Sequence, residues 1–143
     1  MDRVVNLSIP AKPEYVVLCR LALAGVLRDQ RFSEEAVADL KLALSEACSN
    51  SVRHAYPTQD GDAGHVRVLF RLLDDRVVLG ISDDGDGFDE NDDMITEPLP
   101  DGTVVAGEGG MGISLIKAVV DEFKLERPKA GGTCLTLTKL RDQ

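Results

Sequence analysis

Apolar residues recur along this chain with two different spacings, which predict two kinds of secondary structure. Alternation of apolar and polar positions, as at Val66, Val68 and Phe70, is typical of strands that bury one face. The sequence predicts such strands at Arg3–Ile9, His65–Leu73, Arg76–Ile81, Lys124–Arg127 and Thr133–Leu140. Asp74 and Asp75 separate the second strand from the third, so we expect an antiparallel hairpin there.

Apolar positions three and four residues apart predict three helices. The helices are expected at about Glu14–Gln30, from an N-cap at Ser33 to about Ala55, and at Gly112–Phe123. Their apolar stripes are Val17, Leu21, Ala24 and Leu27 in the first, Val37, Leu40, Leu44, Ala47 and Cys48 in the second, and Ile113, Ile116, Val119 and Val120 in the third. The second helix has the clearest start, because Glu34 and Glu35 follow Ser33, where the helix dipole favours acids.

A long segment rich in glycine and aspartate, Asp83–Met111, separates the third strand from the third helix. A loop of this length in a compact domain is usually functional. The order of the elements predicts an α/β chain of the α+β type, a two-layer sandwich with a mixed, mostly antiparallel sheet and helices on one face. The length fits one domain, residues 1–143.

The composition, 43% hydrophobic and 29% charged, is typical of a soluble globular protein. No stretch approaches the roughly 18 consecutive apolar residues of a membrane span, and the start of the chain is too polar for a signal peptide. The cysteines, Cys19, Cys48 and Cys134, are odd in number and far apart. We therefore expect buried or partly buried thiols in a reducing cytoplasm, and neither a disulfide nor a zinc site.

The net charge of -9 is concentrated in one part of the chain. Residues 77–116 contain ten Asp and Glu and no Lys or Arg, whereas the rest contains 15 acidic and 16 basic residues. A pI near 4.6 argues against a general nucleic-acid binder, which needs a basic face. The acidic stretch is also the glycine-rich one, which makes it the first place to look for a site.

Three short motifs are candidates for chemistry. Glu46 and Asn50 are four residues apart on the second helix and therefore project from one face. Asp83–Gly87, Asp-Asp-Gly-Asp-Gly, follows an apolar strand, and Glu108–Gly112, Glu-Gly-Gly-Met-Gly, precedes a helix, where bare amides bind anions. Each motif alone is common on solvated helix faces and in turns.

Other nucleotide and metal motifs fit poorly. The chain has no Gly-x-x-x-x-Gly-Lys-Ser/Thr, so it contains no P-loop. An EF-hand beginning at Asp84 would have Phe88 as its fifth residue and Asp89 as its sixth, where a ligand and a glycine are required. Gly107, Gly109 and Gly112 match Gly-x-Gly-x-x-Gly, but the flanking elements of a Rossmann unit are absent.

The ordered set of motifs resembles the GHKL, or Bergerat-fold, ATPases over roughly Val4 to Leu140. The segment Leu44–Tyr56 is similar to their N box, Asp83–Gly87 and Glu108–Gly112 to two glycine boxes, and Gly131-Gly132-Thr133 to the last box. The ending His54-Ala55-Tyr56 and the form Glu-Gly-Gly-Met-Gly resemble the bacterial anti-sigma factor serine/threonine kinases. The resemblance implies the histidine-kinase-like ATP-binding fold with an ATP lid at about 89–109.

The resemblance also implies roles for residues in binding ATP and Mg²⁺. Asp83 would accept the adenine amine, with Thr133 joining this network and Gly85 and Gly87 letting the backbone pass close to the base. Asn50 would hold Mg²⁺. Gly110 and Gly112 would offer amides to the phosphates, and Gly109 and Met111 would also belong to the nucleotide-binding residues. Glu46 would be the general base toward the incoming hydroxyl. Arg53 is expected either to touch phosphate or to be a surface residue.

The implied function is that of a cytoplasmic protein serine/threonine kinase and anti-sigma factor. It would phosphorylate a STAS-domain anti-anti-sigma protein, sequester a sigma factor and work as a homodimer, without direct contact with nucleic acid or membrane. The alternative is an ATP-binding regulatory module that controls a signalling partner with little or no kinase activity. Because residues 89–109 contain no Lys or Arg, the phosphate charge must be offset by Mg²⁺, by backbone amides, by a base elsewhere such as Arg53 or Lys117, or by the partner.

Overall fold

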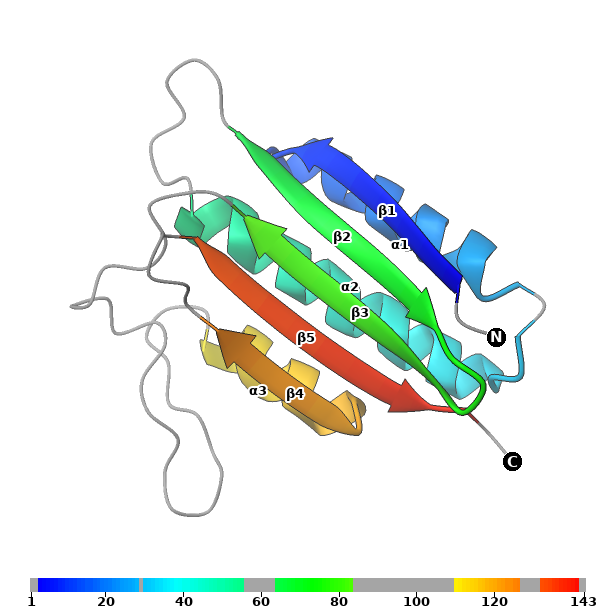
Figure 1. The fold of residues 1–143 in the computed structure, drawn as a ribbon. Helices are drawn as coiled ribbons and strands as arrows, with labels where there is room; N and C mark the ends of the chain where they lie inside the picture. Colours follow the sequence, from blue (N-terminus) through cyan, green and yellow to red (C-terminus); the bar gives the residue numbers. More distant parts are fainter. Residues whose placement is uncertain (1–2, 29, 56–63, 84–109, 127–131, 142–143) are drawn as a thin grey trace.

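The computed structural model describes residues 3–28, 30–55, 64–83, 110–126 and 132–141. Figure 1 shows their arrangement. In chain order the elements are β1 (Arg3–Pro10), the 3-10 turn η1 (Pro13–Tyr15), α1 (Val16–Val26), α2 (Glu34–Ala55), β2 (His65–Leu72), β3 (Arg76–Asp83), α3 (Gly110–Val119), β4 (Glu122–Glu126) and β5 (Thr133–Leu140). The predicted succession of strands and helices is therefore confirmed.

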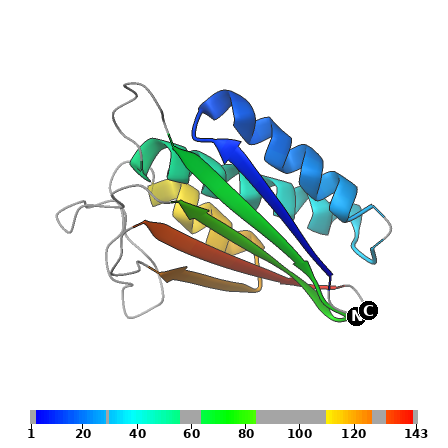
Figure 2. The ribbon, with the colours of Figure 1, turned by 45° about the horizontal axis from the view of Figure 1, so that its top comes forward.

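The strands form one sheet in the order β1-β2-β3-β5-β4, and the helices cover one of its faces (Figure 2). This is the predicted two-layer α+β sandwich. Among the strands that the structure describes, every neighbouring pair is antiparallel, so the expected mixture of parallel and antiparallel pairing is not found there. The expected hairpin is present, and its turn is closed by a hydrogen bond of 2.9 Å from the Leu73 amide to the Arg76 carbonyl.

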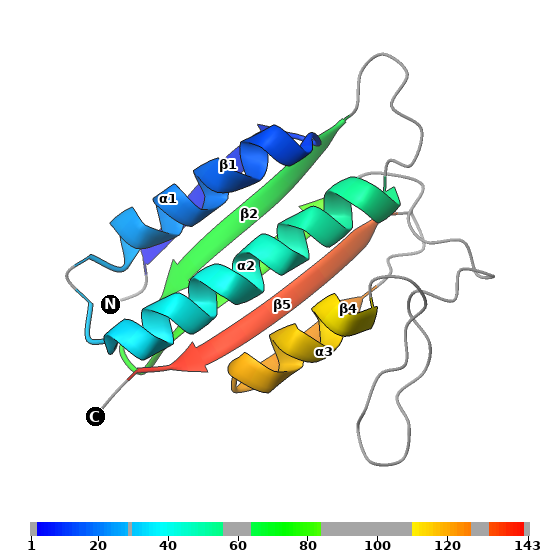
Figure 3. The same ribbon diagram turned by 180° about the vertical axis from the view of Figure 1, so that it is seen from behind.

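Helix α2 lies in the middle of the helical layer, between α1 and α3 (Figure 3). Its predicted stripe is confirmed, because Leu40, Leu44 and Cys48 are fully buried. They pack in one cluster with side chains from the sheet such as Phe70 and Leu137. Each such side chain contributes about 1.5–3 kcal/mol on burial, so α2 is anchored along most of its length.

The N-cap predicted for α2 is also present. The Ser33 hydroxyl oxygen accepts a hydrogen bond from the Ala36 amide at 3.0 Å, which satisfies one of the free amides of the first turn. The start of this helix is thus fixed by a local interaction. None of the helices within the described ranges is long and apolar enough to cross a membrane.

The predicted apolar stripe of α1 is wrong at Val17 and Leu21 but confirmed at Leu27, which lies just after the helix and is 4% exposed. The buried residues of this helix are Val16, Cys19 and Leu23, whereas Val17 and Leu21 are 42% and 63% exposed. The helix is apolar on more than one side, so periodicity alone could not choose the face that packs on the sheet. The α-helix also ends at Val26, before the predicted Gln30, because the chain turns there toward the start of α2.

The third helix is displaced from its predicted range, Gly112–Phe123, to Gly110–Val119. The Asp121 amide donates to the Thr138 carbonyl at 2.9 Å, and Lys139 Nζ donates to the Val119 carbonyl at 3.0 Å. These bonds hold the end of α3 against β5, so that Phe123 already lies in β4, opposite Leu137.

Strand β3 extends two residues beyond its prediction and includes Asp83, which was expected to begin the loop. Asp83 lies opposite Val66 on one side and Thr133 on the other. Because β3 is paired with a strand on each side, its polar last residues, Ser82 and Asp83, also belong to the sheet.

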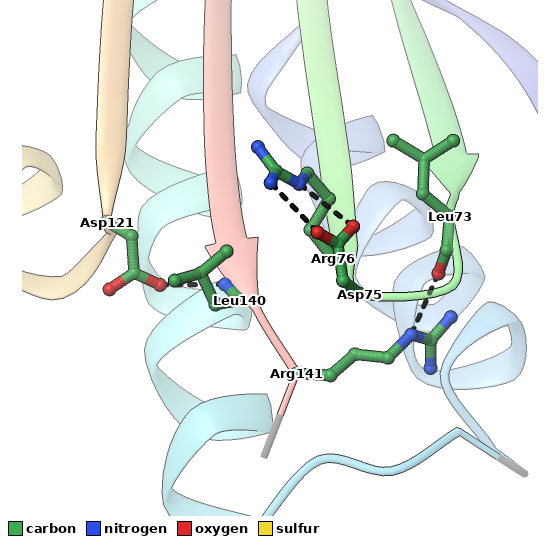
Figure 4. A network of polar contacts seen from close by, with 6 residues as sticks. All are labelled: Leu73, Asp75, Arg76, Asp121, Leu140 and Arg141. Carbon is green, nitrogen blue, oxygen red and sulfur yellow. Dashed lines mark hydrogen bonds and ion pairs between the residues drawn. The ribbon is translucent and has the colours of Figure 1, made fainter. Parts of the chain in front are cut away.

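A polar network closes the opposite end of the sheet, at the β2–β3 turn (Figure 4). Arg76 makes two hydrogen bonds to Asp75, at 2.9 and 3.0 Å, and the bond from Arg76 lowers the pKa of the Asp75 carboxyl. Arg141 Nε donates to the Leu73 carbonyl at 2.9 Å. The Asp75 side chain is largely exposed, so solvent screens the ion pair and its contribution to stability is small.

Candidate functional site

Four chain segments meet at the end of the sheet opposite this network. They are the end of α2, the end of β3, and the starts of α3 and β5, which lie together in both Figure 1 and Figure 3. The predicted site residues within the described ranges all come from these segments. The fold therefore brings together motifs that are far apart in sequence.

Asp83 and Thr133 face each other across β3 and β5 and are only 4% and 6% exposed. Directly opposed residues of antiparallel strands have Cβ atoms about 5 Å apart, so one ligand group can contact both side chains. Thr133 follows Gly132, whose φ of 83° is in the region that favours glycine. Gly132 thus sets the direction in which the chain enters β5 at Thr133.

Asn50 lies in the last turns of α2 and is 6% exposed. Its side-chain oxygen Oδ1 accepts a hydrogen bond from Arg53 Nη2 at 2.6 Å. A guanidinium group has no acceptor, so this bond fixes which way the Asn50 amide is turned. Glu46 lies one turn earlier on the same helix, as the spacing of four residues predicts, and is half-buried.

Two buried polar atoms at this end of the sheet, Asn50 Nδ2 and Thr133 Oγ1, have no hydrogen-bond partner among the residues that the structure describes. A buried group left unsatisfied costs about 1–3 kcal/mol, and such groups in folded proteins mark ligand, ion or water sites. One atom is a donor and the other both donates and accepts, which suits a polar ligand. We infer that this end of the sheet is built to bind one.

The start of α3 provides a second kind of donor. Gly110, Met111 and Gly112 are its first three residues, two residues earlier than predicted. The first amides of a helix have no partner within it and favour anions. Because α3 starts earlier than predicted, the amides of both glycines belong to its first turn. This turn lies near the end of α2, and the two helices pack against each other.

Part of the predicted site falls outside the described residues. This concerns Gly85, Gly87 and Gly109, together with the expected lid at 89–109. Their roles remain predictions. Within the described ranges, no group of three or more His, Cys, Asp or Glu side chains lies together as a metal cluster.

Sequence reasoning left two roles for Arg53 open, a phosphate contact or a surface position. The side chain is exposed, yet it is bonded to Asn50, a role that neither alternative included. The spacing of three residues on a helix, which places side chains side by side, was the available signal.

Comparisons with known proteins identify the family of this chain. A family model described as the histidine kinase-like ATPase domain matches residues 9–139. The chain therefore belongs to the family of histidine kinase-like ATPase domains, and membership of this family implies that it binds ATP.

Within that family the chain is similar to serine-protein kinases named RsbW. It is 36% identical to RsbW of Bacillus pumilus over 138 residues, which cover 94% of this chain and 84% of the relative. It is 40% identical to RsbW of Oceanobacillus iheyensis over 124 residues, which cover 85% and 77% of the two chains.

A solved structure of the RsbU and RsbW domains of Rv1364c from Mycobacterium tuberculosis has the same fold. The match has a TM-score of 0.69 at 23% identity and covers 99% of this chain and 33% of that one.

Proposed function

We propose that this chain is a cytoplasmic, Mg²⁺-dependent protein serine/threonine kinase that transfers the γ-phosphoryl group of ATP to a STAS-domain anti-anti-sigma protein. We further propose that it sequesters a sigma factor. The observation that supports the proposal best is the joint burial of Asp83, Thr133 and Asn50 at one end of the sheet, in a chain similar to serine-protein kinases over nearly its whole length.

The adenine end of the proposed site is the Asp83–Thr133 pair. A carboxylate accepts a hydrogen bond from the exocyclic amine of adenine, and guanine has a carbonyl at that position. A hydrogen bond to a charged group contributes about 1.5–3 kcal/mol, which is enough to select adenine. The unpartnered Thr133 hydroxyl would join the same network.

The phosphate end is formed by α2 and α3. Mg²⁺ takes oxygen ligands and keeps most of its shell as water and phosphate, so the Asn50 oxygen suffices as the protein ligand. The unpartnered Asn50 Nδ2 and the free amides of Gly110 and Gly112 supply donors to phosphate oxygens. The residues present therefore fit a metal–nucleotide complex, in which the metal would neutralise phosphate charge.

Glu46 is proposed to act on the incoming substrate. Its carboxylate would take the proton of the serine or threonine hydroxyl as that oxygen bonds to the γ-phosphorus and ADP leaves. Its place one turn from Asn50 suits this role, because the hydroxyl must approach the phosphate that the metal holds.

The kinase proposal is tested with labelled ATP, Mg²⁺ and a STAS-domain protein from the same genome. We expect transfer to the STAS protein and a loss of at least a hundredfold in Glu46→Gln. Glu35→Gln is the matched control, since Glu35 is an exposed residue in the first turn of the same helix. Normal ATP binding without any transfer would reject the kinase in favour of a regulatory module.

We also propose that the protein is a homodimer formed through β1 and α1. β1 is an edge strand of the sheet, and its Val4 and Val5 are exposed, as are Val17, Leu18 and Leu21 on the neighbouring helix. An apolar face beside an open strand edge suits a second copy of the same chain. Leu21→Glu should give monomers in light scattering, whereas Leu140→Glu should not, because Leu140 is an exposed leucine of β5, which β2 and β3 separate from β1.

A further inference from the structure

The bond between Arg53 and Asn50 uses an atom that the proposed site needs for another purpose. Arg53 Nη2 donates to Asn50 Oδ1 at 2.6 Å, a short distance typical of a bond from a charged donor. Mg²⁺ coordinates amide groups through oxygen, so Oδ1 is also the atom that would hold the metal.

Two cations cannot share this oxygen at low cost. A guanidinium group and Mg²⁺ on the same atom would lie within a few ångströms of each other, and Asn50 is buried, where solvent screens their repulsion only weakly. Asn50 itself is neutral and offsets neither charge. The arrival of the metal therefore favours the departure of Arg53.

Phosphate is the alternative partner for Arg53 once it has left Asn50. Residues 77–116 include the start of α3 and contain no Lys or Arg, so that part of the chain offers phosphate no basic side chain. Arg53 is exposed, lies one turn beyond Asn50 and has a long side chain that ends in a fork of donors suited to phosphate. A rotation of its side chain is all that the change of partner requires.

We propose that Arg53 and Mg²⁺ exchange places on Asn50: in the nucleotide-free protein Arg53 holds Oδ1, and when metal–nucleotide binds, Arg53 moves to the phosphates. This inference rests on the proposed ATP site. It makes Arg53 a phosphate-binding residue that also keeps the Asn50 amide correctly turned before the nucleotide arrives.

A purely structural role for Arg53 gives a different expectation. A cation in the last turn of a helix interacts favourably with the helix dipole, and Arg53 is two residues before Ala55, the last residue of α2. In that case the bond to Asn50 would persist after nucleotide binding. The two roles are distinguished by the state of Asn50 with and without nucleotide.

Asparagine side-chain NMR measures this state directly. The chain has three asparagines, Asn6, Asn50 and Asn91, so selective ¹⁵N labelling gives three pairs of side-chain amide signals. Spectra of the full chain are compared for the unsubstituted protein, Arg53→Ala and Arg28→Ala, without nucleotide and with Mg²⁺ and ADP. Arg28 serves as the control, because it is an exposed arginine that precedes α2, and the helix from Glu34 to Asn50 alone spans about 24 Å.

We expect Arg53→Ala to shift the Asn50 signals in the nucleotide-free protein and to shift them at least threefold less with Mg²⁺ and ADP. Arg28→Ala should shift them in neither state. Equal shifts in both states would show that the bond persists, and no shift in either would show that it does not form. Either result overturns the exchange.

Calorimetric titration with AMP and ADP in the presence of Mg²⁺ tests the phosphate contact. Arg53→Ala should weaken ADP binding about tenfold and change AMP binding less than twofold, because Arg53 reaches the outer phosphates. Equal weakening for both nucleotides would assign Arg53 to the fold instead and overturn the inference. If the unsubstituted protein binds no ADP at all, the proposed function itself fails, which is a separate result.

Discussion

Replacing Thr133 by Val should stabilise the nucleotide-free protein and weaken its binding of ATP. Thr133 is 6% exposed, and within the described part of the chain its hydroxyl has no hydrogen-bond partner. Valine has nearly the same shape and an equally high preference for strands, so the substitution removes the polar atom without leaving a large cavity.

The size of both effects follows from this geometry. An unsatisfied buried hydroxyl costs about 1–3 kcal/mol, so we expect a gain of about 1 kcal/mol in the free energy of unfolding. For a domain of this size that gain raises the melting temperature by about 3–4 °C. Losing a hydrogen bond to the adenine network should reduce ATP affinity about three- to tenfold.

Thermal melting with and without ATP and Mg²⁺ measures the two effects in one assay. Thr138→Val is the matched control, because Thr138 is 5% exposed on the same strand but lies toward the other end of the sheet. It should leave ATP binding unchanged. If Thr133→Val lowers the melting temperature, or leaves ATP affinity within twofold of the original, the assignment of the Thr133 hydroxyl to the nucleotide is wrong.

Asp83→Asn should weaken ATP binding by at least tenfold in calorimetry, since a charge-assisted bond contributes about 1.5–3 kcal/mol. Asp75→Asn, at the exposed turn, should leave ATP binding unchanged. Unchanged binding in Asp83→Asn would reject the adenine assignment. Leu40→Ala should lower the free energy of unfolding by about 2–5 kcal/mol in urea, because Leu40 is fully buried, whereas Leu42→Ala, at a position 41% exposed on the same helix, should cost far less. The Cys48 thiol donates to Cys19, and this bond together with burial raises the pKa of Cys48 well above its ordinary value. The folded protein therefore keeps a proton that the unfolded chain loses in alkali, so stability should fall as the pH rises above about 8.5. Cys48→Ala should flatten that fall in urea titrations at several pH values; an unchanged slope would exclude this thiol as its source.

The sequence by itself determined the elements and the candidate residues. Alternation in β2 and the stripe of α2 are strong local signals, because each element has one apolar face and one polar face. The N-cap at Ser33 depends only on neighbours three residues away. The motifs around Asn50, Asp83 and Gly110 likewise needed no coordinates, because their order along the chain resembles that of the histidine kinase-like ATPases.

Only the tertiary structure decided which faces and ends are used. α1 is apolar on more than one side, so its packing on the sheet, and not its periodicity, selected Cys19 and Leu23 for burial and left Leu21 exposed. The end of α3 depends on bonds from β5, which lies some twenty residues further along the chain.

The pairing of Asp83 with Thr133 and the unpartnered atoms of Thr133 and Asn50 are likewise properties of the assembled sheet and helices. Sequence spacing placed Arg53 beside Asn50 but could not show which atom it holds. A local pattern fixes what a side chain can bond to, whereas the partner that it meets depends on residues brought near it by folding.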